Sequence, residues 1–441
     1  MSSSSYFRRT ILFIGPAIAL LLSAVGIFAF HISGNAHASG PSNTLFVNHV
    51  IITGGNTSCS DPGYNSVQAA VDAAHTGNTV YLCGTTPYSE QVIITKAITL
   101  TGDPGATIQA PLIFSTSLSR LPSKFTTDNL FIPQAIVIVW GEGSNANIIN
   151  LNIMGPLPGN GGCGDDEYGV LVIAGGKASL KGDHVTNIRD ANPTLYGCQF
   201  GVGIQVGRRY WPKADFSTFL VENFIGQATI TKTTVTGYQK NGITVDGPSS
   251  KANIMKSTVE GAGRNTALGN IIAQNGIQIS RGAVGMVESN FVADNSYTGT
   301  SSNASSGGIL VFGGCGDPLS IGVEVEGNVL SNNDVGIYLN NYSADCTAPA
   351  SQKTNDMALN NTISNDAVTN MSSFTASNGS TYSGYQAGID DIGNRDLISH
   401  NTITGIGYTP AQTTPGGPFV IPIDTISFPT NHPRIRSNRI I

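Results

Sequence analysis

Charged side chains are scarce in this chain, at 11% of 441 residues, against roughly 25% in an average globular domain. A disordered chain combines high charge with little apolar content, whereas 40% of these residues are hydrophobic. The net charge of −6 is mild and gives no electrostatic footprint for nucleic acid. We therefore expect a folded chain with no nucleic-acid partner.

Zinc motifs are missing too, because no Cys-x-x-Cys pair or Cys/His cluster provides a site. We expect no cofactor, with calcium as an alternative. Aromatic residues are few, at 7%. Glycine and β-branched residues are plentiful, which favours an all-β protein whose strands are mostly buried.

The N-terminus resembles an export signal. Arg8 and Arg9 precede an apolar run over residues 11–30, and a small-x-small cleavage motif follows at residues 36–38. We predict a cleaved signal peptide over residues 1–38 and a secreted, extracellular protein without membrane contact. The alternative is an uncleaved anchor, because the run is nearly long enough to span a bilayer.

Two short patterns recur along the rest of the chain. The first is a glycine followed by alternating aliphatic residues, beginning at Gly169, Gly203, Gly242, Gly276, Gly308, Gly336 and Gly388. The second is a pair of aliphatic residues five positions apart, such as Ile254 and Val259. A polar residue stands two positions before the second member in nearly every pair: Asp183, Thr233, Ser257, Asn290, Asn328, Asn361, Asn401 and Asn438.

A five-residue offset changes strand parity, so a bend must separate the two aliphatic residues if both point inward. Asparagines stacked at that bend can hydrogen-bond to one another as a ladder, and Asn tolerates the left-handed backbone that a corner needs. Strand, corner, strand and loop repeated in this way predict a parallel β-helix over residues 133–441. A propeller would need four strands per repeat, and a leucine-rich repeat would need helices and a Leu-dominated consensus.

We assign residues 39–110 to an N-terminal cap with the first coils and residues 111–132 to a loop insertion. Residues 66–75 predict a short amphipathic capping helix. The segment 66–108, SVQAAVDAAHTGNTVYLCGTTPYSEQVIITKAITLTGDPGATI, resembles the entry to pectin-lyase-like β-helices, which implies a right-handed parallel β-helix. The resemblance concerns the fold alone. Asp390-Asp391 matches a polygalacturonase motif, but the Gly-His-Gly motif is absent.

The six cysteines should be oxidised in an exported chain. Stacked coils lie about 4.8 Å apart, which suits disulfide geometry, so cysteines at similar points of successive coils should pair. This phase predicts the bridges Cys163–Cys198 and Cys315–Cys346, which leaves Cys59–Cys83.

Outward residues of the Gly-Ile strands should line a groove. When the Gly-Ile repeats are aligned with one another, Asp246 falls one coil from both Arg208 and Arg281. The two guanidiniums could then hold a uronate carboxylate while Asp246 acts as base or binds calcium. The alternative is an exposed ion pair, worth about 0–1 kcal/mol. These three residues are the candidate catalytic residues.

Candidate substrate-binding residues lie nearby. Tyr210 and Trp211 could stack on a sugar ring beside Lys213, or Trp211 could pack onto the helix surface. Gln278 and Tyr338 belong to the outward column. We predict a secreted protein that binds an acidic polysaccharide; cleavage by a lyase or hydrolase activity is open.

The alternative function is a non-catalytic surface, matrix or adhesin-like protein. The chain ends on Ile440-Ile441 inside a coil. The Pro-rich segment 409–422 would therefore fold over that end, or the end would meet another molecule in end-on self-association.

Overall fold

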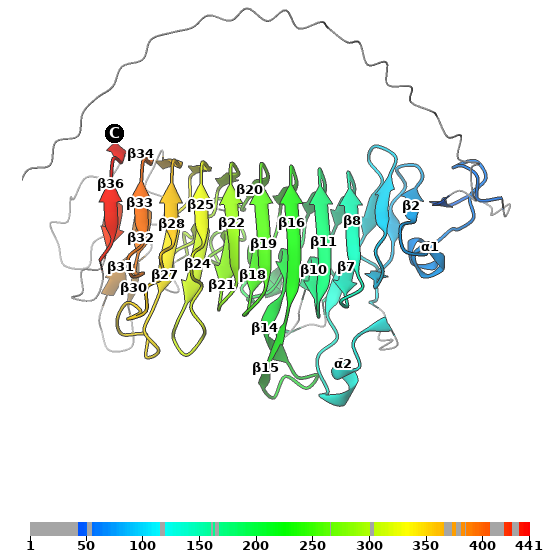
Figure 1. Ribbon diagram of the computed structural model, residues 1–441, viewed down its shortest axis with the longest axis horizontal. Helices are drawn as coiled ribbons and strands as arrows, with labels where there is room; N and C mark the ends of the chain where they lie inside the picture. The colour runs from blue at the N-terminus through cyan, green and yellow to red at the C-terminus, as the bar shows by residue number, and fades with distance from the viewer. Residues whose placement is uncertain are drawn as a thin grey trace, which may run out of the picture. The chain divides into compact units, whose positions relative to one another are not determined.

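The structure, a computed structural model, describes residues 43–441 except for gaps at 51–54, 115–119, 160–161, 164–166, 265, 300–303, 366–372, 376–380, 384, 406–418 and 426–431. The predicted signal peptide at residues 1–38 lies outside the described residues. Three long parallel sheets of 12, 10 and 11 strands make up the fold, and their strands succeed one another in chain order (Figure 1).

The 12-stranded sheet contains β1 Thr44–Val47, β2 Thr79–Leu82, β5 Thr99–Gly102, β8 Asn145–Ile149, β11 Gly176–Lys181, β16 Gly226–Thr231, β19 Lys251–Met255, β22 Val284–Glu288, β25 Glu324–Glu326, β28 Met357–Leu359, β33 Leu397–Ser399 and β36 Arg434–Arg436. The 10-stranded sheet contains β4 Val92–Ile94, β7 Gln134–Trp140, β10 Glu167–Ile173, β13 Val202–Val206, β18 Asn241–Asp246, β21 Asn275–Ser280, β24 Gly307–Gly313, β27 Val335–Asn341, β32 Tyr385–Asp391 and β35 Phe419–Thr425. The 11-stranded sheet contains β3 Tyr88–Ser89, β6 Thr107–Gln109, β9 Asn152–Met154, β12 His184–Thr186, β17 Thr234–Thr236, β20 Thr258–Glu260, β23 Phe291–Ala293, β26 Val329–Ser331, β29 Thr362–Asn365, β34 Thr402–Gly405 and β37 Arg439–Ile440.

From β7 onward, each coil takes one strand from the 10-stranded sheet, then one from the 12-stranded sheet and one from the 11-stranded sheet. The fold is therefore a right-handed parallel β-helix, which confirms the prediction. Two antiparallel pairs project from it: β14 Arg208–Pro212 with β15 Phe219–Phe224, and β30 Ser373–Thr375 with β31 Thr381–Ser383.

The recurring Gly-Ile pattern has a steric origin. Ile243, Ile277 and Ile309 occupy one register position on successive strands and are fully buried, where each side chain contributes about 1.5–3 kcal/mol. A Cβ atom on the preceding residue would clash with the next coil: at Gly242 it would lie 2.6 Å from the carbonyl oxygen of Gly276. Glycine is therefore required beside the aliphatic stack.

The corner between the 12- and 11-stranded sheets is two residues long in nine coils, from β8–β9 to β36–β37. The second residue is the predicted polar one in eight of these corners and Leu151 in the first. The residue before it has positive φ in all nine: Asn150, Gly182, Lys232, Lys256, Ser289, Gly327, Asn360, His400 and Ser437. The left-handed conformation thus belongs to the residue before the ladder, and our assignment of it to the ladder asparagines was wrong.

The asparagine ladder itself is present. The side-chain Oδ1 of Asn328 accepts from the backbone N–H and the Nδ2 of Asn290, at 2.9 and 3.0 Å. The same two bonds join Asn328 to Asn361, Asn361 to Asn401 and Asn401 to Asn438. Each of these side-chain amides therefore satisfies a backbone N–H and a backbone carbonyl of the coil before it, and its own backbone N–H is satisfied by the Asn of the coil after it.

Lysines at the left-handed corner position carry a conformational cost. Lys232 and Lys256 both have a φ of 52°, where Asn and Gly are favoured and other residues are disfavoured by roughly 1 kcal/mol. We expect Lys256→Asn to raise the free energy of unfolding by about 0.5–1 kcal/mol, measured by urea denaturation. Lys251→Asn, in the neighbouring strand, is the matched control, and an equal gain there would contradict a backbone origin.

Helix α1 Val67–Ala73 covers the N-terminal end of the coils, as predicted. Val67, Ala70 and Val71 are buried in the core that fills the coils. The carboxylate of Glu90 accepts from the backbone N–H of Val67 and of Gln68, at 2.8 and 2.9 Å. A carboxylate at this end of a helix is favourable because it pairs with otherwise unsatisfied N–H groups.

The three predicted disulfides are confirmed. The bridged Cα atoms lie 5.5 Å apart in Cys59–Cys83, 4.9 Å in Cys163–Cys198 and 4.6 Å in Cys315–Cys346. At the C-terminal end, residues 406–418 of the Pro-rich segment lie outside the described residues, and Phe419–Thr425 extends the 10-stranded sheet as β35. Capping or end-on self-association at this end therefore stays a prediction.

Candidate functional site

A groove of about 420 Å³ lies on the outer face of the 10-stranded sheet. Its floor is the predicted outward column, because Gln205, Thr244 and Gln278 pair in register on β13, β18 and β21. Its walls come from the β14–β15 hairpin on one side and from the loops that enter the sheet on the other. The groove is therefore built by loops that vary in length between regular coils.

Amide groups on the floor form a hydrogen-bonded network. The Nδ2 of Asn241 donates to the Oε1 of Gln278 and to the hydroxyl of Thr244, at 3.0 and 2.9 Å. The Nε2 of Gln278 donates in turn to the hydroxyl of Ser280 at 2.9 Å. These bonds fix the orientation of donors and acceptors at the floor, which favours the recognition of a hydroxyl-rich ligand.

The predicted contact between Asp246 and Arg281 is present. The Nη1 of Arg281 lies 3.0 Å from the Oδ1 of Asp246, whose side chain is nearly buried. Arg281 and Arg209 both pair with Asp317, at 3.3 and 2.7 Å, and the hydroxyl of Tyr210 also donates to Asp317. Two guanidiniums and two carboxylates thus form one ion-pair network that ties the hairpin to the loop of the Cys315–Cys346 disulfide.

Arg208 does not complete the predicted Arg–Asp–Arg arrangement. On that side of Asp246, the backbone N–H of Arg209 donates to Oδ2 at 2.9 Å. The guanidinium of Arg208 lies over the rings of Trp211 and Tyr168, 5.1 and 5.8 Å from their centroids. The comparison of the repeats correctly placed strand β13 beside the strand of Asp246. It could not show that a hairpin follows Gly207 and turns the side chain of Arg208 away from Asp246.

Trp211 is not available to a ligand, which corrects the stacking hypothesis. Its side chain is 0% exposed, and its Nε1 donates to the carbonyl of Phe131 at 2.8 Å. The ring packs edge-on against Phe125 of helix α2 Lys124–Thr127 and against Phe224. Trp211 belongs to a second apolar cluster on the outer face of the 10-stranded sheet, and Leu121, Phe125 and Leu130 of the predicted insertion belong to the same cluster.

The other predicted residues are divided. Tyr210 and Gln278 line the groove, whereas Lys213 and Tyr338 do not. Tyr338 lies on β27, two strands beyond Gln278 in register. The more exposed ring of the groove is that of Phe219 on β15, which is 59% exposed. The hairpin that brings Phe219 there was not predicted from the sequence.

Lys240 is a groove residue that sequence reasoning missed. It precedes β18, lines the groove and donates from Nζ to the carbonyl of Ala273. Burial lowers the pKa of Lys240 to about 8. Its position could have indicated this role, because Lys240 directly precedes a Gly-Ile strand and the loops that lead into these strands form one wall of the groove.

A separate group of buried carboxyls lies in the C-terminal coils. Asp356, Asp391 and Asp396 are fully buried. Burial, with the nearby Asp396, raises the pKa of Asp391 to about 8 and that of Asp356 well above its usual range. The Oδ1 of Asp396 accepts from the backbone N–H of Asp356 at 2.8 Å, so these carboxyls stabilise loop backbone rather than face the groove.

Among the described residues, no group of three or more His, Cys, Asp or Glu side chains gathers with the geometry of a metal site. No family model matches the sequence, and no curated protein matches it. Similar folds occur among solved structures, and the three named below are each 12% identical to this chain. A lacto-N-biosidase from Eubacterium ramulus has a TM-score of 0.46 over 90% of this chain and 67% of its own. An alginate lyase from Paenibacillus has 0.35 over 85% and 96%, and the Dettilon tailspike protein 0.40 over 90% and 68%.

These distant likenesses define no family for the chain. The class of the protein is given by its own geometry: a disulfide-bridged parallel β-helix with a polar, partly charged groove on one sheet.

Proposed function

We propose that this protein binds an acidic polysaccharide in the groove of the 10-stranded sheet. The observation that carries the proposal is the lining of the groove, where Arg208, Lys240 and Arg281 outnumber the single carboxylate of Asp246. A net positive lining attracts a polyanion. The ordered amides of the floor and the exposed ring of Phe219 supply the hydrogen bonds and the stacking surface that sugars use.

An extracellular setting follows from the same proposal. Three disulfides close loops in this chain, and such bridges persist in oxidising compartments. In the part of the chain that the structure describes, no helix has the length and apolarity to cross a bilayer.

Binding is favoured over cleavage because Asp246 is already engaged. Its Oδ1 accepts from Ser280 and Arg281 at 2.8 and 3.0 Å, and its Oδ2 accepts from the backbone of Arg209. These bonds assign the carboxylate to the support of Arg281 and of the hairpin. A catalytic base would instead hold a lone pair toward the substrate.

The test is calorimetric titration of the purified protein with short galacturonate oligosaccharides, with neutral malto-oligosaccharides as the control ligand. Reducing ends and ultraviolet absorbance are recorded on the same samples. Binding without new products supports the proposal. Product formation would replace it with an enzymatic function, and an absence of binding would favour a structural or adhesin-like protein.

Lys240 gives this test a pH signature. Because its pKa is about 8, the side chain of Lys240 is positively charged below that pH and neutral above it. We expect oligogalacturonate affinity to fall roughly fivefold between pH 7 and 9, equivalent to about 1 kcal/mol. Lys240→Arg should abolish the fall, and Lys240→Met should lower affinity at pH 7 by a similar factor, while the exposed Lys353→Met is the matched control. An unchanged pH profile in Lys240→Arg would contradict the assignment.

A further inference from the structure

Five exposed lysines gather on another face, over the 12-stranded sheet and the corner that follows it. This lysine strip consists of Lys177, Lys181, Lys232, Lys251 and Lys256. They lie on three successive coils, β11, β16 and β19. None of them forms an ion pair with another residue that the structure describes, so their charges are left to solvent or to a ligand.

The register of the sheet fixes the spacing of the strip. Lys177 pairs with Gln227, and Gln227 pairs with Lys251, so the two lysines stand two strands apart, about 9.6 Å. Lys181 lies four residues further along the same strand as Lys177, about 13 Å away. The cations therefore form a regular two-dimensional array on a rigid sheet. Because the backbone that carries them is already ordered, binding costs little backbone entropy.

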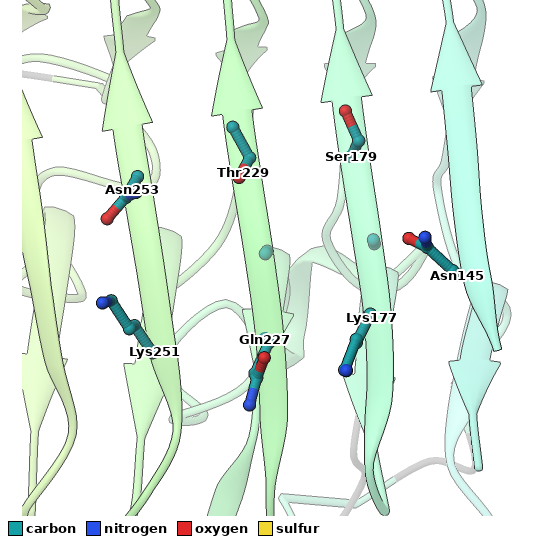
Figure 2. A pocket seen from close by; sticks show the side chains of 9 residues that line it. Asn145, Lys177, Ser179, Gln227, Thr229, Lys251 and Asn253 are labelled. Atoms are coloured by element: carbon teal, nitrogen blue, oxygen red, sulfur yellow. The ribbon is translucent and has the colours of Figure 1, made fainter. Parts of the chain in front are cut away.

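Neutral hydrogen-bonding groups fill the space between these cations. Figure 2 shows Asn145, Lys177, Gln227 and Lys251 in one row and Ser179, Thr229 and Asn253 in the next, all projecting from adjacent strands. They line a shallow hollow of about 340 Å³. Ala178 and Ala228, the remaining lining residues, are small and nearly buried, so the hollow has no ring on which a nucleic-acid base could stack.

The corner lysines add an independent observation. Lys232 and Lys256 occupy the left-handed position at which other coils carry Asn, Gly, Ser or His. Strained backbone conformations cluster at functional sites. Two adjacent coils thus carry a cation at a position that Asn or Gly would occupy with less strain.

Carboxylates mark the limits of the strip. Glu142 borders Lys177 on the N-terminal side. On the C-terminal side, Glu288 pairs in register with Met255, and Glu326 pairs with Glu288. The electrostatic sign of the sheet therefore changes between β19 and β25, which confines an anionic ligand to the coils of the strip.

We infer that the lysine strip is a docking surface for an anionic polysaccharide, separate from the groove. The interleaved hydroxyl and amide groups match the hydroxyls of a sugar chain, and the cations match its sulfate or carboxylate groups. Ligands without sugar hydroxyls or with lipid tails fit less well, because the strip has neither stacking rings nor apolar side chains to insert. The strip would hold the protein on an anionic matrix and leave the groove free. This inference does not rest on the function proposed for the groove.

The experiment measures binding of the full chain to dextran sulfate, with uncharged dextran as the neutral probe. We expect Lys177→Gln with Lys251→Gln to weaken dextran sulfate binding about tenfold at low salt and to reduce its salt dependence. Lys232→Asn with Lys256→Asn should weaken it similarly without loss of stability, which separates binding from folding. Glu326→Gln should strengthen it, because a repulsive charge at the edge is removed.

Lys353→Gln is the matched control, since Lys353 is exposed and lies outside the strip. An equal loss in Lys353→Gln, or no loss in either double variant, would overturn the inference. Equal or tighter binding of single-stranded DNA or of anionic phosphatidylserine vesicles would also overturn it in favour of those partners. Lys240→Met is measured on the same dextran sulfate: a loss in Lys240→Met with none in Lys177→Gln with Lys251→Gln would place the binding in the groove and overturn the inference, so the groove and the strip can fail separately.

Discussion

Replacement of Asn361 by alanine is expected to lower the free energy of unfolding by about 3–5 kcal/mol, from the loss of several buried hydrogen bonds. The Oδ1 of Asn361 accepts from the backbone N–H and the Nδ2 of Asn328, and its Nδ2 donates to the carbonyl of Val325 and to Asn401. Alanine leaves the N–H of Asn328 and the carbonyl of Val325 buried without these partners. Each such group costs about 1–3 kcal/mol.

The measurement is equilibrium denaturation in urea, followed by circular dichroism. Asn145→Ala is the control, because Asn145 is exposed on the outer face of β8, and we expect a change there within about 0.5 kcal/mol. A loss at Asn361 no larger than the loss at Asn145 would show that water replaces the ladder contacts, and the ladder would then not be a source of stability.

The second large effect concerns pH. The pKa of Asp391 is raised by burial and by Asp396 from an ordinary value of 3.8 to about 8, so the folded state binds a proton that the unfolded state releases. The stability from this group is fully present below pH 3.8 and is lost as the pH rises toward 8. At its steepest, one such group changes the free energy of unfolding by about 1.4 kcal/mol per pH unit.

Asp391→Asn should therefore flatten the dependence of stability on pH between about 4 and 8 and should make the protein more stable than the wild type at pH 8.5. The amide mimics the protonated carboxyl and carries no charge into the buried cluster. The check is a series of thermal or urea unfolding curves across this range, with the exposed Asp215→Asn as the control. A wild-type stability that rises over the same range would mean that Asp391 is ionised in the folded protein.

The coils were predictable because one physical constraint repeats in every one of them. Gly242 and its counterparts avoid a clash with the next strand, and the five-residue offset between Ile254 and Val259 records a corner of fixed length. The disulfides followed from the same phase. The left-handed residue was misassigned because Asn360 and Asn361 stand side by side, and parity alone does not tell which of them turns the chain.

The parts of the groove that lie on the repeated strands were predictable, and the parts that come from loops outside the repeat were not. The pairing of Asp246 with Arg281 follows strand register. The positions of Trp211 and Phe219 depend on the β14–β15 hairpin and on helix α2, which pack on the sheet through contacts distant in sequence. Asp317 reaches the network from a loop 71 residues beyond Asp246 in the sequence, and local patterns contain no sign of that contact.

The two-residue corner has a consequence for engineering and for natural variation of this scaffold. Its length is constant in nine coils, whereas the other two edges carry segments as different as a single tight turn and a whole hairpin. An insertion at the constant edge would displace a ladder amide and break its hydrogen bonds to the coils on either side, while one at the variable edges leaves the stack unaltered. Foreign peptides should therefore be grafted beside the groove, where sequence drift among natural variants of the protein is also expected to concentrate.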